Sequence, residues 1–392
     1  MSFWCLETLI DPVKPSDFFG DYFEQQRLLV KRDVPGYFGD LISVADIDRI
    51  LTRNDLNRQQ ARIADASRTI EASSYVDEHG TVDPNQLLRL HDEGGTIVLN
   101  HLHKSHPPLA ELCASLEPEF GGRFQSNIYL TPGNAQGFRP HFDTHDVFVL
   151  QVEGSKKWRL YDTLIELPIK AHSGQTQQDN PGDVRETFEM HAGDTLYVPR
   201  GIVHDAVSTD EDSLHITVGV LTWTWIDLLT EAVDHLAATD SKARASLPRD
   251  FVNENWDREG FDVAFKALVE GLSKGIESDI IRRRFAERFI DERSPAPSNR
   301  LTALRRLSEV EIDTIIGCRS HMAWLIDEED GRLIVRFHRG EMKLPLHTES
   351  AVRHALQTQR FRVGDLAGPL DDAGKVVLVR RLLKEGLLEF VD

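Results

Sequence analysis

The stretch PHFDTHDVFVLQVEGSKKW, residues 140–158, decides which fold we predict for this chain. It places His141, Asp143 and His145 on alternate positions, next to the largely apolar run DVFVLQV. Alternate side chains of an extended strand point to the same face, so these three polar groups are expected to share one face. Burying them there costs free energy unless something binds them. The stretch therefore predicts a strand that either faces solvent or holds a ligand.

The segment around this stretch, from Gly121 to Gly219, is divided into short apolar or alternating runs by turn signals. The runs are FQSNIYLTP, DVFVLQV, KKWRLYD, GDTLYVP and SLHITVGVLTW, and the turn signals are PGN, EGS, AGD and PRG. Many short strands separated in this way are typical of a β-sandwich or a β-barrel. We therefore predict a barrel over about residues 121–225.

Helical patterns flank this segment on both sides, so the chain as a whole is expected to be α+β. Upstream, Ser43 is the expected N-cap of a helix in SVADIDRILT, and Pro107 begins the helical pattern PPLAELCASLEPEF. Downstream, the patterns DLLTEAVDHLAA, FDVAFKALVEGLSKG and ESDIIRRRFAERFI predict helices over about residues 226–300.

The last part of the chain, residues 301–392, is predicted to be a separate domain that follows the linker SPAPSN at 294–299. It offers the short strands GRLIVRFH and MKLPL, the helices ESAVRHALQTQ and AGKVVLVRRLLKEG, and the closing run LLEFVD. A helix, a turn, a second helix and a strand in this order suggest a winged-helix-like module. The chain is thus expected to contain three parts, 1–225, 226–300 and 301–392.

The net charge of −19 limits the partners that the chain would bind. It disfavours non-specific binding to nucleic acid and to anionic membranes. It suits a basic partner, such as a Lys/Arg-rich protein or peptide. An acidic surface that only keeps the protein soluble is the competing interpretation.

Cysteine usage and the N-terminal sequence bear on the compartment. Cys5, Cys113 and Cys318 are far apart and odd in number, which argues against a disulfide framework and against a cysteine-based zinc site. The N-terminal residues lack a basic region followed by an apolar core, and no apolar run approaches the roughly 20 residues needed to cross a bilayer. We therefore expect a cytoplasmic protein without a signal peptide.

Two histidines and one carboxylate can form a metal site in the predicted barrel. His141 and Asp143 are two apart on one strand, so both side chains can point inward. The segment GDTLYVPRGIVHDAV supplies His204 just after a turn, on an expected neighbouring strand. Such a set of two histidines and one carboxylate suits Fe(II) and leaves positions open for a cosubstrate and dioxygen.

Three other histidines of the predicted barrel are candidate ligands. His145 lies on the same face as His141 and could be the ligand in its place. His191 and His215 are interpreted as structural or surface residues.

With these residues in view, the sequence resembles the JmjC-type cupins of the ribosomal oxygenase family. The resemblance is carried by NIYLTPGNAQGFRPHFDTHDVFVLQVEGSKKWRLYD, GDTLYVPRGIVHDAV and SLHITVGV, and upstream by SDFFGDYFEQQRLLVKR and GTIVLNHLHKSHPPL. It covers about residues 8–225 and is looser beyond. It implies a double-stranded β-helix, the jelly-roll barrel of cupins and JmjC domains. A helical dimerisation region and a winged-helix C-terminus would follow this barrel.

The resemblance also implies the cofactors. Fe(II) would be held by His141, Asp143 and His204, with 2-oxoglutarate and dioxygen as cosubstrates at the iron. Lys156, in EGSK, stands where the family has the Lys or Arg that binds the distal carboxylate of 2-oxoglutarate. A lysine that points inward from the strand paired with the His-x-Asp strand would otherwise be an unpaired buried charge. Its neighbour Lys157 is expected to point outward.

Further cosubstrate contacts are expected from Asn127 and Tyr129, which match polar positions lining the pocket in the family. Relatives often carry a hydroxyl where this chain has Gly219, and Thr217 could compensate for its absence. Without the resemblance, we would interpret Asn127 and Tyr129 as ordinary strand residues with satisfied hydrogen bonds. Lys156 would be interpreted as a solvated lysine in a turn.

The function implied by the resemblance is that of a 2-oxoglutarate-dependent dioxygenase. It would hydroxylate the β-carbon of an arginine or histidine in a ribosomal protein, and the chain would form a homodimer. Hydroxylation of a natural-product precursor peptide and N-methyl-lysine demethylation use the same iron site and stay open as alternatives.

Two other classes of protein compete with this reading. A cupin isomerase or hydrolase with another metal would need a fourth protein ligand or a dedicated base. A transcription regulator would use the barrel as its sensor and the helix DDAGKVVLVRRLLKEG to read DNA. In that helix Asp371, Asp372 and Glu385 offset the basic residues, so we expect no direct contact with nucleic acid.

Overall fold

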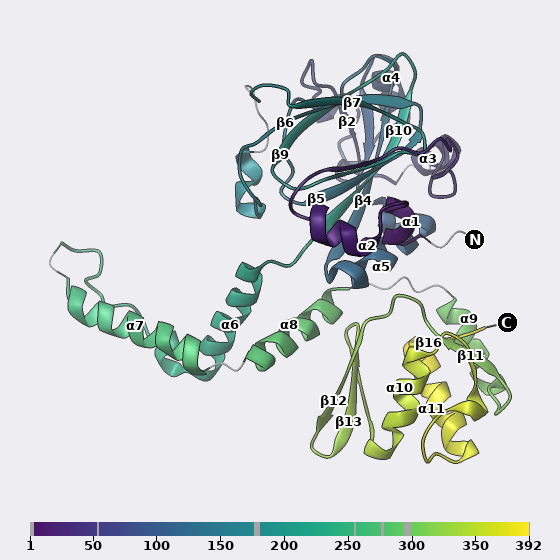
Figure 1. Ribbon diagram of the computed structural model, residues 1–392, viewed down its shortest axis with the longest axis vertical. Coiled ribbons are helices and arrows are strands. Elements are labelled where there is room, and N and C mark those ends of the chain that lie inside the picture. The colour runs from purple at the N-terminus through teal and green to yellow at the C-terminus, as the bar shows by residue number, and fades with distance from the viewer. Residues whose placement is uncertain are drawn as a thin grey trace. The chain divides into compact units, whose positions relative to one another are not determined.

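The structure is a computed structural model that describes residues 4–52, 55–175, 181–254, 256–275, 278–293 and 299–391. The chain divides into two compact units, Met1–Thr222 and Trp223–Asp392, whose elements are shown in Figure 1. Residues 294–298, which make up most of the predicted linker SPAPSN, lie outside the described residues. Within the described ranges, no helix combines the length and the hydropathy that crossing a membrane requires.

The unit Met1–Thr222 is built around two antiparallel sheets that pack face to face. The large sheet has the strand order β1-β8-β5-β10-β4-β3-β2, and the small sheet has the order β7-β6-β9. The strands are β1 Leu28–Val30, β2 Ala61–Ala64, β3 Thr96–Leu99, β4 Arg123–Thr131, β5 Asp146–Glu153, β6 Ser155–Thr163, β7 Glu186–His191, β8 Thr195–Val198, β9 Ile202–Ser208 and β10 Ser213–Leu221. Strands β4 to β10 agree with the barrel predicted for residues 121–225.

Alternation along the central strands gives the large sheet two different faces. On β5, Phe148 and Leu150 belong to a core shared with the helices that precede the barrel. Val147 and Val149 point the other way and pack against Trp158 of the small sheet. The preceding helices are α1 Leu6–Ile10, α2 Pro15–Asp17, α3 Val44–Leu51, α4 Pro84–Asp92 and α5 Pro107–Phe120.

A tight turn at Gly154 carries the chain from the large sheet to the small one. Gly154 has φ +65°, and a Cβ atom there would lie 1.9 Å from the carbonyl oxygen of Asp212, so only glycine fits. Strand β6 then pairs with β7 and β9. The prediction that the strand of Lys156 pairs with the His-x-Asp strand was therefore wrong, because this turn places β5 and β6 in opposite sheets.

The unit Trp223–Asp392 begins with the three helices predicted for residues 226–300. These are α6 Trp225–Thr239, α7 Arg258–Gly275 and α8 Ser278–Glu292. The later elements are α9 Arg300–Arg305, β11 Ile315–Cys318, β12 Trp324–Glu329, β13 Arg332–Phe337, β14 Gly340–Pro345, α10 Glu349–Gln357, β15 Phe361–Arg362, α11 Asp372–Glu385 and β16 Leu388–Phe390. The two sheets β15-β11-β16 and β12-β13-β14 share a core with α10 and α11, in which Val335, Val352 and Val379 are fully buried.

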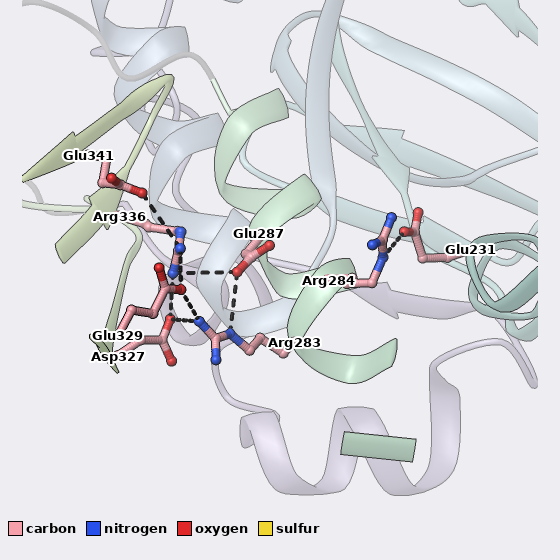
Figure 2. A network of polar contacts seen from close by, with 8 residues as sticks. All are labelled: Glu231, Arg283, Arg284, Glu287, Asp327, Glu329, Arg336 and Glu341. Carbon is pink, nitrogen blue, oxygen red and sulfur yellow. Dashed lines mark hydrogen bonds and ion pairs between the residues drawn. The ribbon is translucent and has the colours of Figure 1, made fainter. Parts of the chain in front are cut away.

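An ion-pair network connects α8 to the sheet β12-β13-β14 (Figure 2). Arg283 of α8 lies 3.0 Å from a carboxylate oxygen of Asp327 and 2.8 Å from one of Glu329. Arg336 of β13 pairs with the same two carboxylates and with Glu287 of α8. Because Asp327 and Glu329 are each shared between two guanidinium groups, the network holds α8 against this sheet.

Candidate metal centre

Three side chains from two segments converge in the unit Met1–Thr222. One ligand atom each of His141, Asp143 and His204 lies within 4.8 Å of the other two. His204 is on β9, and His141 forms an isolated antiparallel bridge with it. Each of the two histidines donates its backbone N–H to the carbonyl of the other, at 3.0 and 2.8 Å. The three residues predicted to bind a metal are therefore brought together.

The segment that carries His141 and Asp143 is not a regular strand. Strand β5 begins only at Asp146, and the residues between it and the bridge at His141 form a loop. Within this loop, the carbonyl of Asp143 accepts a hydrogen bond of 3.1 Å from the backbone N–H of Gly201, which lies in the turn before β9. The side chains still alternate, since Phe142 is buried in a different cluster. The predicted shared face is therefore present for the two ligands, but the predicted strand is not.

Hydrogen bonds fix the orientation of both imidazole rings. Nδ1 of His141 lies 2.9 Å from the carbonyl oxygen of Arg139, and Nδ1 of His204 lies 3.0 Å from that of Ile202. A carbonyl can only accept, so each Nδ1 carries the proton and donates it. Each Nε2 then keeps its lone pair for a metal, which is the usual arrangement of metal-binding histidines. Two imidazole nitrogens and one carboxylate oxygen form a donor set suited to Fe(II).

The charges at the cluster agree with metal binding. Burial and the neighbouring His141 lower the pKa of His204 to about 4, so its ring is neutral at physiological pH. Burial raises the pKa of Asp143, but the nearby histidines outweigh burial and hold its pKa below the ordinary value. Asp143 is therefore ionised at physiological pH, and it offers a carboxylate beside the neutral imidazole of His204.

Lys156 is buried in the same barrel. Lys156 is only 4% exposed, and its Nζ donates a hydrogen bond of 2.9 Å to the hydroxyl oxygen of Thr131 on β4. Burial lowers the pKa of Lys156 to about 7. The next residue, Lys157, is exposed, as the predicted strand register requires.

The strand register separates Lys156 from the metal cluster along the barrel. Lys156 is paired with Ser208 on β9, four residues beyond His204, which corresponds to about 13 Å along the strand. Two buried polar atoms of this region have no hydrogen-bond partner among the described residues, namely Nδ1 of His215 and Nε1 of Trp158. Buried polar atoms are nearly always paired, so a polar ligand that hydrogen-bonds these two atoms would satisfy them.

Asn127, Tyr129 and Thr217 lie on the same inward-facing rows as these groups. Tyr129 stacks on His215, with ring centroids 4.8 Å apart, and burial together with Asp143 raises its pKa to about 12. Asn127 accepts a hydrogen bond of 2.9 Å from the backbone N–H of His101. Thr217 on β10 lies opposite Asn127 in the pairing of β4 with β10. All three residues are therefore on the face of the large sheet that is turned toward the small sheet, because Thr217 is paired with Val149, which packs on Trp158.

The other three candidate histidines do not join the metal cluster. His191 is exposed on β7, and His215 is buried beside Tyr129. His145 packs on Gly219, where a Cβ atom would lie 2.6 Å from its Cδ2 atom. The imidazole of His145 therefore occupies the space in which relatives were expected to carry a hydroxyl group.

Sequence reasoning did not assign Thr131, His215 or Trp158 to the pocket. A signal for Thr131 was present, because the alternation in NIYLT places it on the same face as Asn127 and Tyr129. His215 and Trp158 carried no such signal, since their place depends on which strands pair.

Comparisons with known proteins agree with this geometry. Residues 101–228 match the JmjC domain family. The chain is similar to NO66 of Dictyostelium discoideum, which is named a bifunctional lysine-specific demethylase and histidyl-hydroxylase. The two are 35% identical over 262 residues, and the match covers 63% of this chain and 49% of NO66. The chain is also 33% identical over 309 residues to ribosomal oxygenase 1 of Rattus norvegicus, and this match covers 74% of this chain and 51% of that protein. The chain thus spans about half the length of these curated relatives.

Among solved structures, the chain is similar to the Escherichia coli ribosomal oxygenase YcfD. The TM-score is 0.58 at 16% identity, and the match covers 97% of this chain and 98% of the other. A structure of YcfD in complex with cobalt and 2-oxoglutarate also gives a TM-score of 0.58, at 15% identity, with 97% and 99% covered. The similarity shows a common JmjC cupin fold.

Proposed function

Residues 101–228 of this chain are a JmjC domain, and from this premise we propose that the protein is an Fe(II)- and 2-oxoglutarate-dependent oxygenase. The observation that carries the proposal is a buried lysine in the same barrel as three converging ligand atoms. A metal site alone gives no reason to bury a lysine without a carboxylate partner. A dicarboxylate cosubstrate does, because its distal carboxylate needs a cation away from the metal.

His141, Asp143 and His204 would hold Fe(II), which together with 2-oxoglutarate supplies the activation of dioxygen. The carbonyl groups that accept from the two Nδ1 atoms keep each Nε2 turned toward the metal position. Asp143 supplies the only negative charge among the three ligands. No acid, base or nucleophile from the protein is assigned, since positioning is the task of these residues.

Lys156 and Thr131 would bind the distal carboxylate of 2-oxoglutarate. The hydroxyl of Thr131 already contacts the lysine, so both groups can donate to the same carboxylate. Tyr129, Asn127 and Thr217 would line the space between this carboxylate and the iron. The unpaired Nδ1 of His215 and Nε1 of Trp158 offer further polar contacts in that space.

The proposed substrate is a basic protein segment, in the first place an arginine or histidine side chain of a ribosomal protein. The net charge of −19 favours such a partner. The relatives named histidyl-hydroxylase and ribosomal oxygenase support a protein substrate. The name lysine-specific demethylase, carried by the first of them, keeps N-methyl-lysine demethylation as the second candidate. A precursor peptide stays a third possibility for the same chemistry.

The proposed domains are the barrel with its N-terminal extension over 1–225, a helical dimerisation region over 226–300 and a winged-helix-like module over 301–392. The dimer is supported by exposed apolar residues at helical spacing. They are Trp225, Leu229 and Val233 on α6 and Phe265 and Val269 on α7, each four residues after the one before it on its helix. We further propose a cytoplasmic location, which the free thiols of the three cysteines fit.

The C-terminal module is proposed to make protein contacts and not to read DNA. Two basic residues of α11 are used inside the module. Nζ of Lys375 donates to the carbonyl of Gly364 at 2.6 Å, and Nη2 of Arg380 donates to that of Val310 at 2.9 Å. A recognition helix needs its basic side chains free for phosphates and bases, so this observation weighs against the regulator.

Mass spectrometry of ribosomal proteins from cells with and without this gene tests the proposal. One ribosomal protein should lose a single oxygen in the deletion strain, and peptide fragmentation should place that oxygen on an arginine or histidine. Purified protein should convert 2-oxoglutarate to succinate in the presence of Fe(II). Absence of that turnover with any supplied peptide would remove the oxygenase assignment, whereas unchanged ribosomal masses would redirect the search to other substrates.

A further inference from the structure

A second group of charges is buried where the two ligand-bearing segments meet. Asp146 is fully buried and Arg200 is only 7% exposed. Nη1 of Arg200 lies 2.6 Å from Oδ2 of Asp146. Asp146 begins β5, three residues after Asp143, and Arg200 lies in the turn before β9, four residues before His204. The ion pair therefore spans the same two segments as the metal ligands.

The buried groups form a closed set of contacts with Tyr197 and Glu24. Asp146 accepts hydrogen bonds from the Tyr197 hydroxyl at 2.9 Å and from the backbone N–H of Arg200 at 3.3 Å. Arg200 also pairs with Glu24 at 2.7 Å, and the backbone N–H of Glu24 donates to the Tyr197 hydroxyl at 2.9 Å. Removing Arg200 would leave the buried carboxylate of Asp146 without a cation, which is strongly unfavourable.

Glu24 adopts an unusual backbone conformation to take part in this set. Its φ of +59° is in the left-handed region, which costs free energy for a residue with a Cβ atom. Both the side chain and the N–H of Glu24 are bonded to the group around Arg200. Such strain persists only where the surrounding contacts determine it, and it is concentrated at functional sites.

The ion pair is connected to the metal ligands through the backbone. The N–H of Gly201, next to Arg200, donates to the carbonyl of Asp143 at 3.1 Å. One end of the segment from Asp143 to Asp146 is therefore held by Gly201, and the other end is held by the Arg200 guanidinium. The β8–β9 turn that makes both contacts leads directly into the strand of His204.

We propose that Arg200 and Asp146 are positioning residues that set the separation of Asp143 and His204 and so preorganise the metal site. The pair would not touch the metal. Its effect would be to place the carboxylate and the imidazole at bonding distance before the metal arrives. This inference rests on the proposed metal site.

Cobalt(II) titration of the full chain, followed by its visible absorption spectrum, tests the inference without any substrate. The variants Asp146→Asn and Arg200→Gln should bind cobalt(II) about 10- to 100-fold more weakly, the range found for residues that orient metal ligands. Their cobalt spectra should also change, because the ligand geometry changes.

Asp194→Asn provides a matched control. Asp194 is a buried carboxylate in the turn between β7 and β8, where it accepts from the backbone N–H groups of Arg32 and His191. This variant should lower the thermal stability of the metal-free protein but leave the cobalt(II) affinity and spectrum unchanged. Equal loss of cobalt(II) affinity in control and test variants would overturn the inference, because general loosening of the barrel would then explain both.

Two milder variants cover the case in which the first pair does not fold. Glu24→Gln and Arg200→Lys keep the shape or the charge of the set, and each should give a smaller loss of cobalt(II) affinity. Wild-type affinity and spectrum in every folded variant would overturn the inference. Asp143→Ala separates this outcome from failure of the metal site itself. If Asp143→Ala still binds cobalt(II) normally, the proposed metal site is wrong, and the positioning role is lost with it.

Discussion

The ammonium group of Lys156 donates to the hydroxyl oxygen of Thr131 at 2.9 Å, and no carboxylate among the described residues forms an ion pair with it. Burying a cation without an anionic partner lowers the free energy of unfolding. A bound anion would offset this loss. The proposed function uses this pair to hold a carboxylate of the cosubstrate.

Lys156→Ala is expected to weaken 2-oxoglutarate binding by about 30-fold or more. Losing one partner of a desolvated charge pair costs roughly 2 to 5 kcal/mol, and each 1.4 kcal/mol is tenfold in affinity. Anaerobic titration of 2-oxoglutarate into Fe(II)-loaded protein measures this. Lys157→Ala is the control and should behave as wild type, because Lys157 is exposed on the opposite face. Similar affinities for the two variants would refute the pocket assignment.

The pH dependence of cosubstrate binding should report the state of Lys156. Its pKa is lowered to about 7, so the free protein loses this positive charge as the pH rises through 7. Affinity for 2-oxoglutarate should be full below that pH and fall above it, by up to about tenfold per pH unit. Lys156→Arg keeps its charge and should bind with little pH dependence. A flat profile in the wild type would contradict this role.

The same group should affect the stability of the ligand-free protein in the opposite direction. The folded pKa of about 7 is below the ordinary value of 10.5, so folding disfavours the charged form. The cost is fully present below pH 7 and is relieved as the pH rises toward 10.5. Urea titrations should therefore show that Lys156→Met stabilises the protein more at pH 6 than at pH 9. An equal effect at both values would disprove the linkage.

Asp143→Ala is expected to abolish 2-oxoglutarate turnover while the barrel still folds, because it removes the only anionic ligand. Circular dichroism checks the fold, and succinate formation checks the activity. His145→Ala should leave iron binding nearly intact, since His145 is outside the cluster of converging ligand atoms. If iron binding required His145 and not His141, the ligand set would have to be redrawn.

Gly219→Ser is expected to destabilise the protein by about 1 to 3 kcal/mol, the usual cost of overpacking. The new Cβ atom would lie 2.6 Å from the His145 ring and would displace it. The second substitution His145→Ala removes the clash, so the double variant should regain stability. Thermal unfolding of the two single variants and the double variant measures the coupling. Additive effects would show that the two residues do not share this space.

Two of the three proposed metal ligands, His141 and Asp143, were accessible to sequence reasoning because their spacing is a local property. His141 and Asp143 share a face whether the backbone is a strand or a short extended loop, and so the error about the strand did not disturb them. The exposure of Lys157 followed from alternation in the same way. Such arguments need no knowledge of the partner strands.

The remaining features depend on which strands pair. The turn at Gly154 sends β6 to the opposite sheet, and no local pattern distinguishes such a turn from an ordinary hairpin. The proximity of Thr131 to Lys156 and the stacking of Tyr129 on His215 follow from that topology. The ion pair of Arg200 and Asp146 likewise joins distant segments, and neither residue type identifies its partner in the sequence.

The backbone bridge between His141 and His204 joins residues that are separated by the whole of β5, β6, β7 and β8. Contacts of such long separation require much loop entropy to be lost first, so they are expected to form late in folding. A metal that binds only the folded barrel stabilises it by mass action. Interactions absent from the transition state slow unfolding and leave the folding rate unchanged. Metal loading should therefore lengthen the lifetime of the folded barrel without making it fold faster.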